Sequence, residues 1–448
     1  MIADLVPRLS QPVPRYTSYP TAPHFHDGVT AQTYRTWLGA LAPDTLLSLY
    51  LHIPFCDRLC WFCACHTRQT LRHAPVARYL KALHREIETV ADLTPARKVS
   101  AVHLGGGSPT MLEPDEIAAL GVLLHTAFSF IPDAEIAVEI DPNDMTAEKA
   151  AALAAIGVNR ASLGIQDFDA DVQQAINRLQ SFEQTADTID SLRQRGIERI
   201  NVDLLYGLPL QTEASVRRTL EQVLQFRPSR IALFGYAHVP WMKKHQTLLP
   251  TDQLPDAMAR YRQARMAEQV LLDSGYLRIG IDHFALPEDS LARAAASGQV
   301  HRNFQGYTTD GAEALLGFGA SAIGRLPQGY VQNDVPTHRY EAAVREGRLA
   351  TSRGFELSAA DRARGYAIES LMCSFRLRYA DLKARFGDEG EPIRDTAQRI
   401  AQSDEDGLVI ADGEGLQLTD TGRVFARVIA SKFDSYLGAP GPRHSVAV

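Results

Sequence analysis

Cysteine is scarce in this sequence of 448 residues: there are five, and four of them lie between positions 56 and 65. Such clustering excludes a disulfide framework, which a chain of this length does not need for stability. Long apolar runs are also missing. No stretch approaches the ~20 apolar residues that a helix needs to cross a bilayer, and residues 1–11 lack the apolar core of a secretion signal. We therefore expect a cytoplasmic protein with reduced thiols and no membrane span.

Positive charge is not in excess either, because 46 Lys and Arg stand against 53 Asp and Glu, with a formal net charge of −7. The absence of a basic block excludes a general nucleic-acid binder but allows a local cationic pocket. The length predicts a large and a smaller domain. We expect an N-terminal segment at 1–45 that packs over the active site, a catalytic domain at 46–345 and a C-terminal helical domain at 346–448. We also expect a monomer.

Apolar runs and helical runs alternate from residue 46 onward. Strands are predicted near 46–53, 99–105, 135–140, 160–166, 199–206 and 230–237, and helices near 76–91, 114–127, 146–156, 181–195 and 212–226. Strands separated by helices indicate an α/β fold with a parallel sheet that closes, or partly closes, into a barrel. The active site of such a barrel lies at the carboxyl ends of its strands.

The two ends of the chain have a different character. Residues 14–21 are too rich in proline and turn formers for a regular element, and residues 30–41 are predicted to form a helix behind a threonine cap. In the last part, helices near 358–373 and 391–402 precede a hairpin with its turn at Asp412-Gly413, and a final helix follows near 420–437. This order predicts a winged-helix-like domain, whose acidic wing favours a lid or docking role over DNA binding.

The cysteines carry the strongest chemical signal. Cys56, Cys60 and Cys63 have the spacing C-x3-C-x2-C, which can hold three irons of a [4Fe–4S] cluster and leave the fourth iron open. Zinc stays an alternative because His52 and His66 flank the loop, although no second ligand pair follows downstream. Cys65 and Cys373 receive no role.

This loop, with its aromatic residues Trp61 and Phe62, resembles the signature of the radical S-adenosylmethionine (radical SAM) enzymes. The resemblance implies that Cys56, Cys60 and Cys63 bind the cluster, that its open iron binds the methionine moiety of SAM, and that cleavage of SAM yields a 5′-deoxyadenosyl radical. A glycine-rich turn, here Gly105–Thr110, pairs with the amino group of SAM in that superfamily, although a glycine run alone also fits an ordinary tight turn.

Several blocks along nearly the whole chain resemble one family within that superfamily, the oxygen-independent coproporphyrinogen III oxidases (coproporphyrinogen III dehydrogenases). The blocks lie at residues 14–21, 50–56, 105–110, 203–209, 236–240, 282–285, 301–307 and 372–377. The resemblance implies an incomplete (βα)6 barrel with a C-terminal helical domain, one [4Fe–4S] cluster and two molecules of SAM. Trp61 and Ser108, where tyrosine and threonine are usual, and the stretch 241–246 depart from the family pattern.

The family pattern also assigns roles to single residues. Those implied to surround SAM are Tyr50, Phe62, Gly106, Gly107, Ser108, Glu139, Gln166, Arg178, Asp203, Ala237 and Ile323, with Ile323 beside the second SAM. Those with an implied part in catalysis are Tyr50, Glu139, Phe304 and Gln305. On chemistry alone, a strand-end carboxylate suits ribose hydroxyls, whereas Arg178 could equally be a solvated arginine on a helix surface.

The implied reaction is the oxidative decarboxylation of two propionate side chains of coproporphyrinogen III to vinyl groups in haem biosynthesis. It requires a reduced electron-donor protein. The four carboxylates of the tetrapyrrole call for cations, and Arg15, His301 and Arg302 are the candidates. Two alternatives stay open: a haem-binding chaperone that keeps the cysteine loop, and a radical SAM methyltransferase or cyclopropane-forming enzyme.

Overall fold

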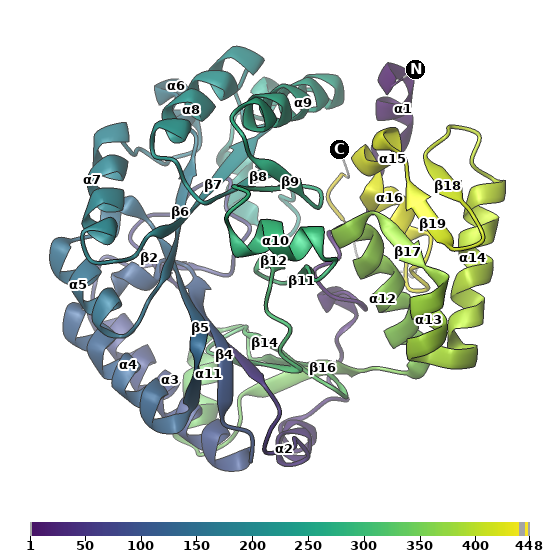
Figure 1. The fold of residues 1–448 in the computed structure, drawn as a ribbon. Helices are drawn as coiled ribbons and strands as arrows, with labels where there is room; N and C mark the ends of the chain where they lie inside the picture. Colours follow the sequence, from purple (N-terminus) through teal and green to yellow (C-terminus); the bar gives the residue numbers. More distant parts are fainter. Residues whose placement is uncertain (1, 439–443, 447–448) are drawn as a thin grey trace.

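A single large mixed sheet organises the fold (Figure 1). The computed structural model describes residues 2–438 and 444–446. The sheet has 12 strands in the order β16-β15-β14-β13-β1-β4-β5-β6-β7-β8-β10-β9. Its centre is a run of parallel strands, β1-β4-β5-β6-β7-β8. Strands that are adjacent in this run belong to successive βα units of the chain.

The parallel run confirms the predicted α/β fold. Its strands are β1 (Leu47–Ile53), β4 (Lys98–Gly106), β5 (Ser129–Ile140), β6 (Arg160–Gln166), β7 (Arg199–Tyr206) and β8 (Arg230–Gly235). The helices between them are α3 (Ala74–Leu93), α4 (Pro114–Ala127), α5 (Ala147–Ala155), α6 (Ala170–Ala175), α7 (Phe182–Arg193) and α8 (Glu213–Gln225). In Figure 1 these helices form the outer layer, on the side away from the C-terminal domain. β5 begins six residues before its predicted start, and β8 ends before 237.

Further strands that the sequence analysis missed extend the sheet at both edges. Beside β1 lie β13 (Ala314–Phe318), β14 (Ile323–Leu326), β15 (Gly329–Asn333) and β16 (Thr351–Glu356), and beside β8 lie β10 (His283–Ala285) and β9 (Leu277–Ile279). Only β13 among them is parallel to its neighbour in the central run. The sheet therefore curves around a cavity without closing, as an incomplete barrel does.

A buried carboxylate ties the added strands to the helical layer. Glu86 of α3 is 3% exposed and accepts hydrogen bonds from the Gly319 amide, the Asn333 amide group and the Tyr340 hydroxyl. Burial raises the pKa of Glu86 to about 7 although these donors oppose the shift. Since each donor comes from a different segment after β13, the carboxylate fixes the position of this edge relative to α3.

The C-terminal domain has its own core and a small sheet. It contains α12 (Ala359–Ser374), β17 (Arg376–Arg378), α13 (Tyr379–Phe386), α14 (Glu391–Gln402), β18 (Val409–Ala411), β19 (Gly415–Leu418), α15 (Asp420–Val424) and α16 (Ala426–Ser431). The winged arrangement of helices and hairpin agrees with the prediction. Two details were wrong: the wing has three strands in the order β17-β19-β18, and the final helix is two short helices.

The N-terminal segment divides between the two cores. Side chains of Leu5, Val6, Val13, Tyr16 and Tyr19 belong to the core of the C-terminal domain, and α1 (Ile2–Leu9) lies beside that domain in Figure 1. The predicted helix behind Thr30 is α2 (Ala31–Gly39), which packs on α3 in the main core.

Domain boundaries follow from this packing. β16 pairs with β15 in the large sheet, so we propose that the C-terminal domain begins after Glu356 and not at residue 346. Among the residues described, no helix combines the length and apolar character needed to span a membrane.

Candidate active site

A cavity of about 580 Å³ lies inside the curve of the sheet. This volume is in the range of small-molecule sites. It is lined by most of the residues implied by the family pattern, which lie on eight separate segments: Cys56, Cys60, Phe62, Cys63, Gly106, Gly107, Ser108, Glu139, Gln166, Arg178, Asp203, Ala237, Phe304 and Gln305. Most of them follow the carboxyl ends of β4 to β8, where the barrel rule predicts the site.

The cysteine loop begins at β2 (Phe55–Cys56) and returns through β3 (Arg68–Gln69). Among the described residues, only Asp57, Asp141 and Asp144 form a group of three or more potential ligand side chains within 4.8 Å of one another, so the three thiols are spread more widely. One tetrahedral zinc with Zn–S bonds of about 2.3 Å would hold its sulfurs roughly 3.8 Å apart. A cube, in which each thiolate binds a different iron, suits the wider spacing.

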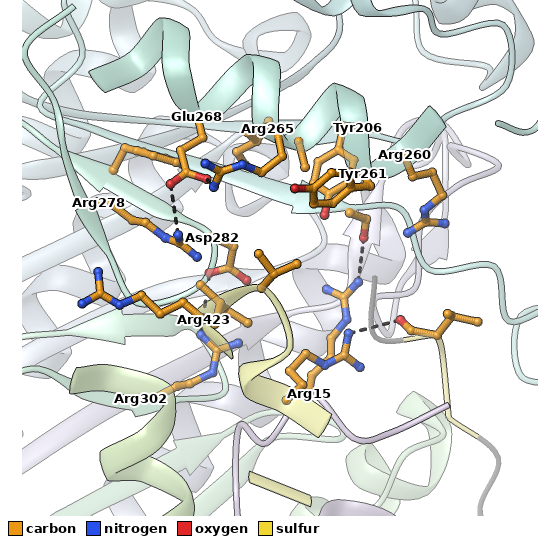
Figure 2. A pocket seen from close by; sticks show the side chains of 18 residues that line it. Arg15, Tyr206, Arg260, Tyr261, Arg265, Glu268, Arg278, Asp282, Arg302 and Arg423 are labelled. Atoms are coloured by element: carbon orange, nitrogen blue, oxygen red, sulfur yellow. Dashed lines mark hydrogen bonds and ion pairs between the residues drawn. The ribbon is translucent and has the colours of Figure 1, made fainter. Parts of the chain in front are cut away.

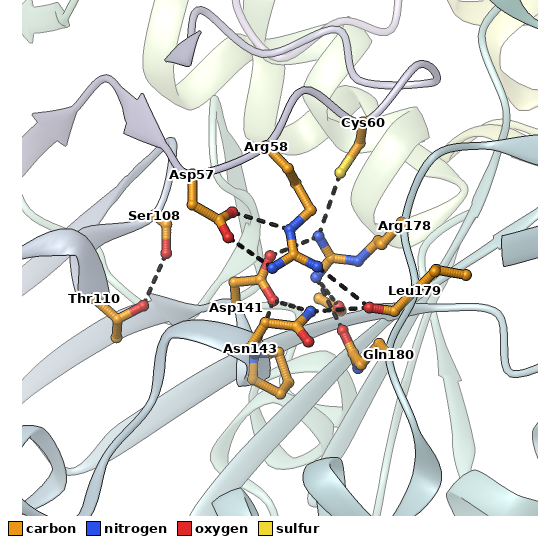
Figure 3. A network of polar contacts seen from close by, with 12 residues as sticks. Asp57, Arg58, Cys60, Ser108, Thr110, Asp141, Asn143, Arg178, Leu179 and Gln180 are labelled. Atoms are coloured by element: carbon orange, nitrogen blue, oxygen red, sulfur yellow. Dashed lines mark hydrogen bonds and ion pairs between the residues drawn. The ribbon is translucent and has the colours of Figure 1, made fainter. Parts of the chain in front are cut away.

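Arg178 holds the loop to the barrel (Figure 3). It follows α6 in an irregular segment and is 7% exposed, so it is not a solvated helix residue. Its Nη1 donates to the Asp141 carboxylate at 2.9 Å and lies 3.5 Å from the Cys60 sulfur, and its Nη2 donates to the Gly164 carbonyl. Neighbouring Arg58 reaches Asp57 and the Leu179 carbonyl. One guanidinium thus joins the cysteine loop to the ends of β5 and β6.

The glycine-rich turn packs against the same loop. The amides of Gly107 and Ser108 donate to the carbonyls of Ile53 and Phe55 at 2.8 and 2.7 Å, and the Gly106 amide donates to Glu139. These amides are engaged within the protein, so the turn does not offer them to a ligand. A Cβ at Gly107 would stand 2.5 Å from the Phe55 carbonyl oxygen, which only glycine avoids.

Glu139, at the end of β5, is held in one orientation. Its Oε1 accepts from His103 Nε2 at 2.9 Å and its Oε2 from the Gly106 amide at 3.0 Å. Burial alone would raise the pKa of Glu139, but the hydrogen bonds from His103 and Gly106 outweigh it and the pKa is lowered. The cavity therefore presents an oriented carboxylate that stays ionised at neutral pH.

Asp203 and Gln166 continue the polar wall on β7 and β6. Asp203 accepts a hydrogen bond from Ser162 at 3.2 Å. Gln166 has a φ of 70°, a left-handed conformation that costs a non-glycine residue roughly 1–2 kcal/mol. The register between β6 and β7 shifts between Gly164 and Gln166, and this irregularity sets the direction of the side chain.

The carboxyl of Asp203 predicts a pH-dependent stability. Burial, reinforced by the charge of Glu139, raises the pKa of Asp203 to about 7, above the value of about 3.9 for an unfolded chain. The stabilisation from this group is fully present below about pH 4 and is lost as the pH rises through about 7. As the pH rises from 5 to 8, the free energy of unfolding of Asp203→Asn should therefore increase by about 1–2 kcal/mol relative to that of the unmodified protein.

Denaturant unfolding of Asp203→Asn and of the unmodified protein, both cofactor-free, at pH 5 and at pH 8 measures this difference in the free energy of unfolding. A stability difference between Asp203→Asn and the unmodified protein that does not change with pH would contradict the assignment.

Residues 301–308 form a hairpin over the cavity, not an irregular loop. Its strands are β11 (His301–Asn303) and β12 (Gly306–Thr308), so Phe304 and Gln305 stand at the turn and line the cavity. The Arg302 side chain is 4% exposed and stacks on Tyr307, whereas His301 is exposed beside Glu369. Of the three candidate cations, Arg15 and Arg302 line the cavity and His301 does not.

Tyr50 and Ile323 stand apart from the cavity lining. The Tyr50 hydroxyl and His52 Nδ1 form a hydrogen bond of 2.9 Å, and the ring stacks on His103, the partner of Glu139. Ile323 is on β14, next to Gly317 of β13. The structure therefore places Tyr50 behind His103, the partner of Glu139, and leaves Ile323 outside the lining of the cavity.

The comparison with known proteins decides the family. Residues 50–223 match the radical SAM superfamily and residues 357–425 the HemN C-terminal domain. The oxygen-independent coproporphyrinogen III oxidase of Bradyrhizobium diazoefficiens is 48% identical over 437 residues, which cover 97% of each chain. This chain belongs to the oxygen-independent coproporphyrinogen III oxidase family. The family is part of the radical SAM superfamily, whose members use a [4Fe–4S] cluster and SAM.

Other members agree in sequence and in fold. The Escherichia coli enzyme of the same name is 40% identical over 436 residues, covering 97% of this chain and 95% of its own. The solved structure of coproporphyrinogen III oxidase from Escherichia coli, described as a radical SAM enzyme, superposes with a TM-score of 0.90 at 39% identity. It covers 95% of this chain and 100% of that one. The predicted family and fold are confirmed.

Some residues that shape the site were not among those predicted from the sequence. His103 orients Glu139, and Asp141 pairs with Arg178. His103 could have been found as a polar residue within an apolar strand. Asp141 could have been found as a carboxylate directly after a strand end. Arg160 and Arg230 line the far end of the cavity and pair with Asp289, a contact between distant segments that no local pattern reveals.

Proposed function

We propose that this enzyme decarboxylates two propionate side chains of coproporphyrinogen III to vinyl groups, giving protoporphyrinogen IX. The observation that carries the proposal is the meeting of the cysteine loop, the oriented Glu139 and the cations Arg15 and Arg302 around one 580 Å³ cavity. Each conversion releases CO2 and a hydrogen atom from the carbon next to the pyrrole, and one electron passes to an acceptor. A reduced electron-carrier protein starts each cycle.

The donor set of the cavity fits the two cofactors. Cys56, Cys60 and Cys63 would hold the cluster, and Glu139 and Asp203 have acceptor oxygens for the amino group or hydroxyls of SAM. When bound, the cluster and SAM supply a radical that can remove a hydrogen atom from an unactivated carbon.

The chain itself supplies position and shielding. The turn at Phe304 and Gln305 lines the cavity, as do Arg15 and Thr17 of the N-terminal segment. Since a misplacement of about 1 Å can reduce a rate 100-fold, rigid positioning of the propionate is the main task of the protein. We propose that two molecules of SAM bind and that the enzyme acts as a monomer.

Anaerobic turnover tests the proposal. Reconstituted enzyme with SAM, a reductant and coproporphyrinogen III should yield protoporphyrinogen IX with two 5′-deoxyadenosine molecules for each product. Tight haem binding without turnover would identify a chaperone instead, and a methylated product would identify a methyltransferase.

Glu139→Gln should weaken SAM binding roughly 10- to 100-fold, because a neutral amide replaces the charged acceptor. Equilibrium dialysis of SAM against the cluster-loaded enzyme measures this loss. Glu183→Gln is the matched control, since Glu183 is exposed at the start of α7. Equal SAM affinities of Glu139→Gln and Glu183→Gln would show that Glu139 does not bind SAM.

A further inference from the structure

A second, smaller cavity of about 110 Å³ adjoins the first (Figure 2). Its walls come from α9 (Ala257–Asp273), the strands β8 to β10, the N-terminal segment and the C-terminal domain. Arg15, Gly235 and Arg302 line both cavities, so these residues form the partition between them. The volume has room for a small polar group and not for a tetrapyrrole ring.

Positive charge dominates this cavity. Among the described residues, seven arginines and two acids line it. Glu268 accepts from Arg265 and Arg278, and Asp282 lies 3.8 Å from Arg302. Burial, together with the charges of Arg15 and Arg302, lowers the pKa of Arg427 to about 9. Arginines therefore outnumber acids among the described residues that line the cavity.

Two of the arginines present unused donors. The Arg302 side chain is 4% exposed, and its Nε and Nη1 have no hydrogen-bond partner in the described part of the chain. Arg260, on α9, likewise buries an Nε without a partner there. Leaving a buried charged donor unsatisfied is expensive, and a bound anion removes the cost. Figure 2 shows both groups on opposite sides of the cavity.

We propose that this arginine cavity binds carboxylate groups of the tetrapyrrole that are not being decarboxylated, an inference that rests on the proposed function. The tetrapyrrole ring and the reacting propionate occupy the larger cavity, beside the cysteine loop. A second propionate extends between the partition residues into the arginine cavity, where Arg302 and Arg260 bind it. Planar guanidinium groups bind carboxylates through paired hydrogen bonds. The C-terminal domain, through Arg427, and the N-terminal segment, through Arg15, thereby contribute to substrate recognition.

Direct binding of coproporphyrinogen III to the cluster-loaded enzyme tests the inference without turnover. Anaerobic ultrafiltration, with the ligand measured by fluorescence after oxidation, should show roughly 10- to 100-fold weaker binding for both Arg302→Gln and Arg260→Gln. SAM affinity and iron content should stay unchanged. Arg348→Gln, an exposed arginine paired with Glu346, is the matched control and should bind as the unmodified enzyme does.

The tetramethyl ester of the same ligand provides the second arm. The unmodified enzyme should bind the ester more weakly than the acid, and this preference should shrink in Arg302→Gln. Arg302→Lys, which keeps the charge without the fork, should bind with intermediate strength and report on folding. Unchanged binding of coproporphyrinogen III in both glutamine variants would overturn the inference. Turnover by the unmodified enzyme would in that case still support the proposed function. An unmodified enzyme that neither binds nor converts coproporphyrinogen III would overturn both.

Discussion

Replacing Cys60 with serine should abolish retention of the iron–sulfur cluster and reduce turnover below detection. Cys60 is the buried member of the three proposed ligands and lies against the Arg178 guanidinium. A serine hydroxyl is a poor ligand for iron in such a cluster, and two remaining thiolates do not hold a cube. Iron and sulfide analysis after anaerobic reconstitution, with the visible absorption of the cluster, measures the loss.

Cys373→Ala is the matched control for this prediction. Cys373 packs beside the small core around β9 and α10 (Ser290–Ala296), which contains no residue of the cysteine loop. The Cys373→Ala variant should keep the iron content and the turnover of the unmodified enzyme. If Cys60→Ser retained a full complement of iron and sulfide, the assignment of Cys60 as a ligand would be wrong.

Replacing Arg178 with methionine should lower the free energy of unfolding by about 3–5 kcal/mol, the loss expected when one partner of a buried ion pair is removed. The change leaves Asp141 as a carboxylate 12% exposed without its partner and frees the Gly164 carbonyl. Denaturant unfolding of the cluster-free protein measures the effect. The cysteine loop should also lose order, because Arg178 is its link to β5 and β6.

A surface pair of the same chemistry provides the control. Arg218 and Asp169 are 3.1 Å apart, and the Arg218 side chain is 62% exposed. Arg218→Met should cost less than about 1 kcal/mol. In a double-mutant cycle, Asp141→Asn should add little to Arg178→Met, since each change alone breaks the pair. Additive losses would mean that Arg178 and Asp141 stabilise the fold independently.

The central strands could be predicted from the sequence because burial on both faces leaves a signal in the chain itself. β1, β6 and β7 read as apolar runs between helices, and α4 and α14 begin and end where their periodicity predicts. The cysteine spacing identified the cluster loop for a similar reason, since three ligands of one metal group lie in a single short segment. Signals of this kind need no knowledge of tertiary contacts.

The missing parts depend on contacts between distant segments. β13 to β16 are four to six residues long and include glycines, so a local pattern does not distinguish them from loops. The role of Arg178 follows from Asp141 and Cys60, which are 37 and 118 positions away. The arginine cavity is assembled from α9, the hairpin and residues near both ends of the chain, and the overall net charge of −7 did not indicate it.

The shared core of residues 5–19 and the C-terminal domain has a consequence for biosynthesis. Residues 5–19 are synthesised before the large sheet and residues 359–433 after it, so this core can form only once the C-terminal domain has been made. Until then the N-terminal segment has no surface to pack against, and Arg15 has not yet taken its place in the partition. The position of Arg15 between the two cavities therefore depends on a core whose C-terminal half is synthesised after every strand of the large sheet.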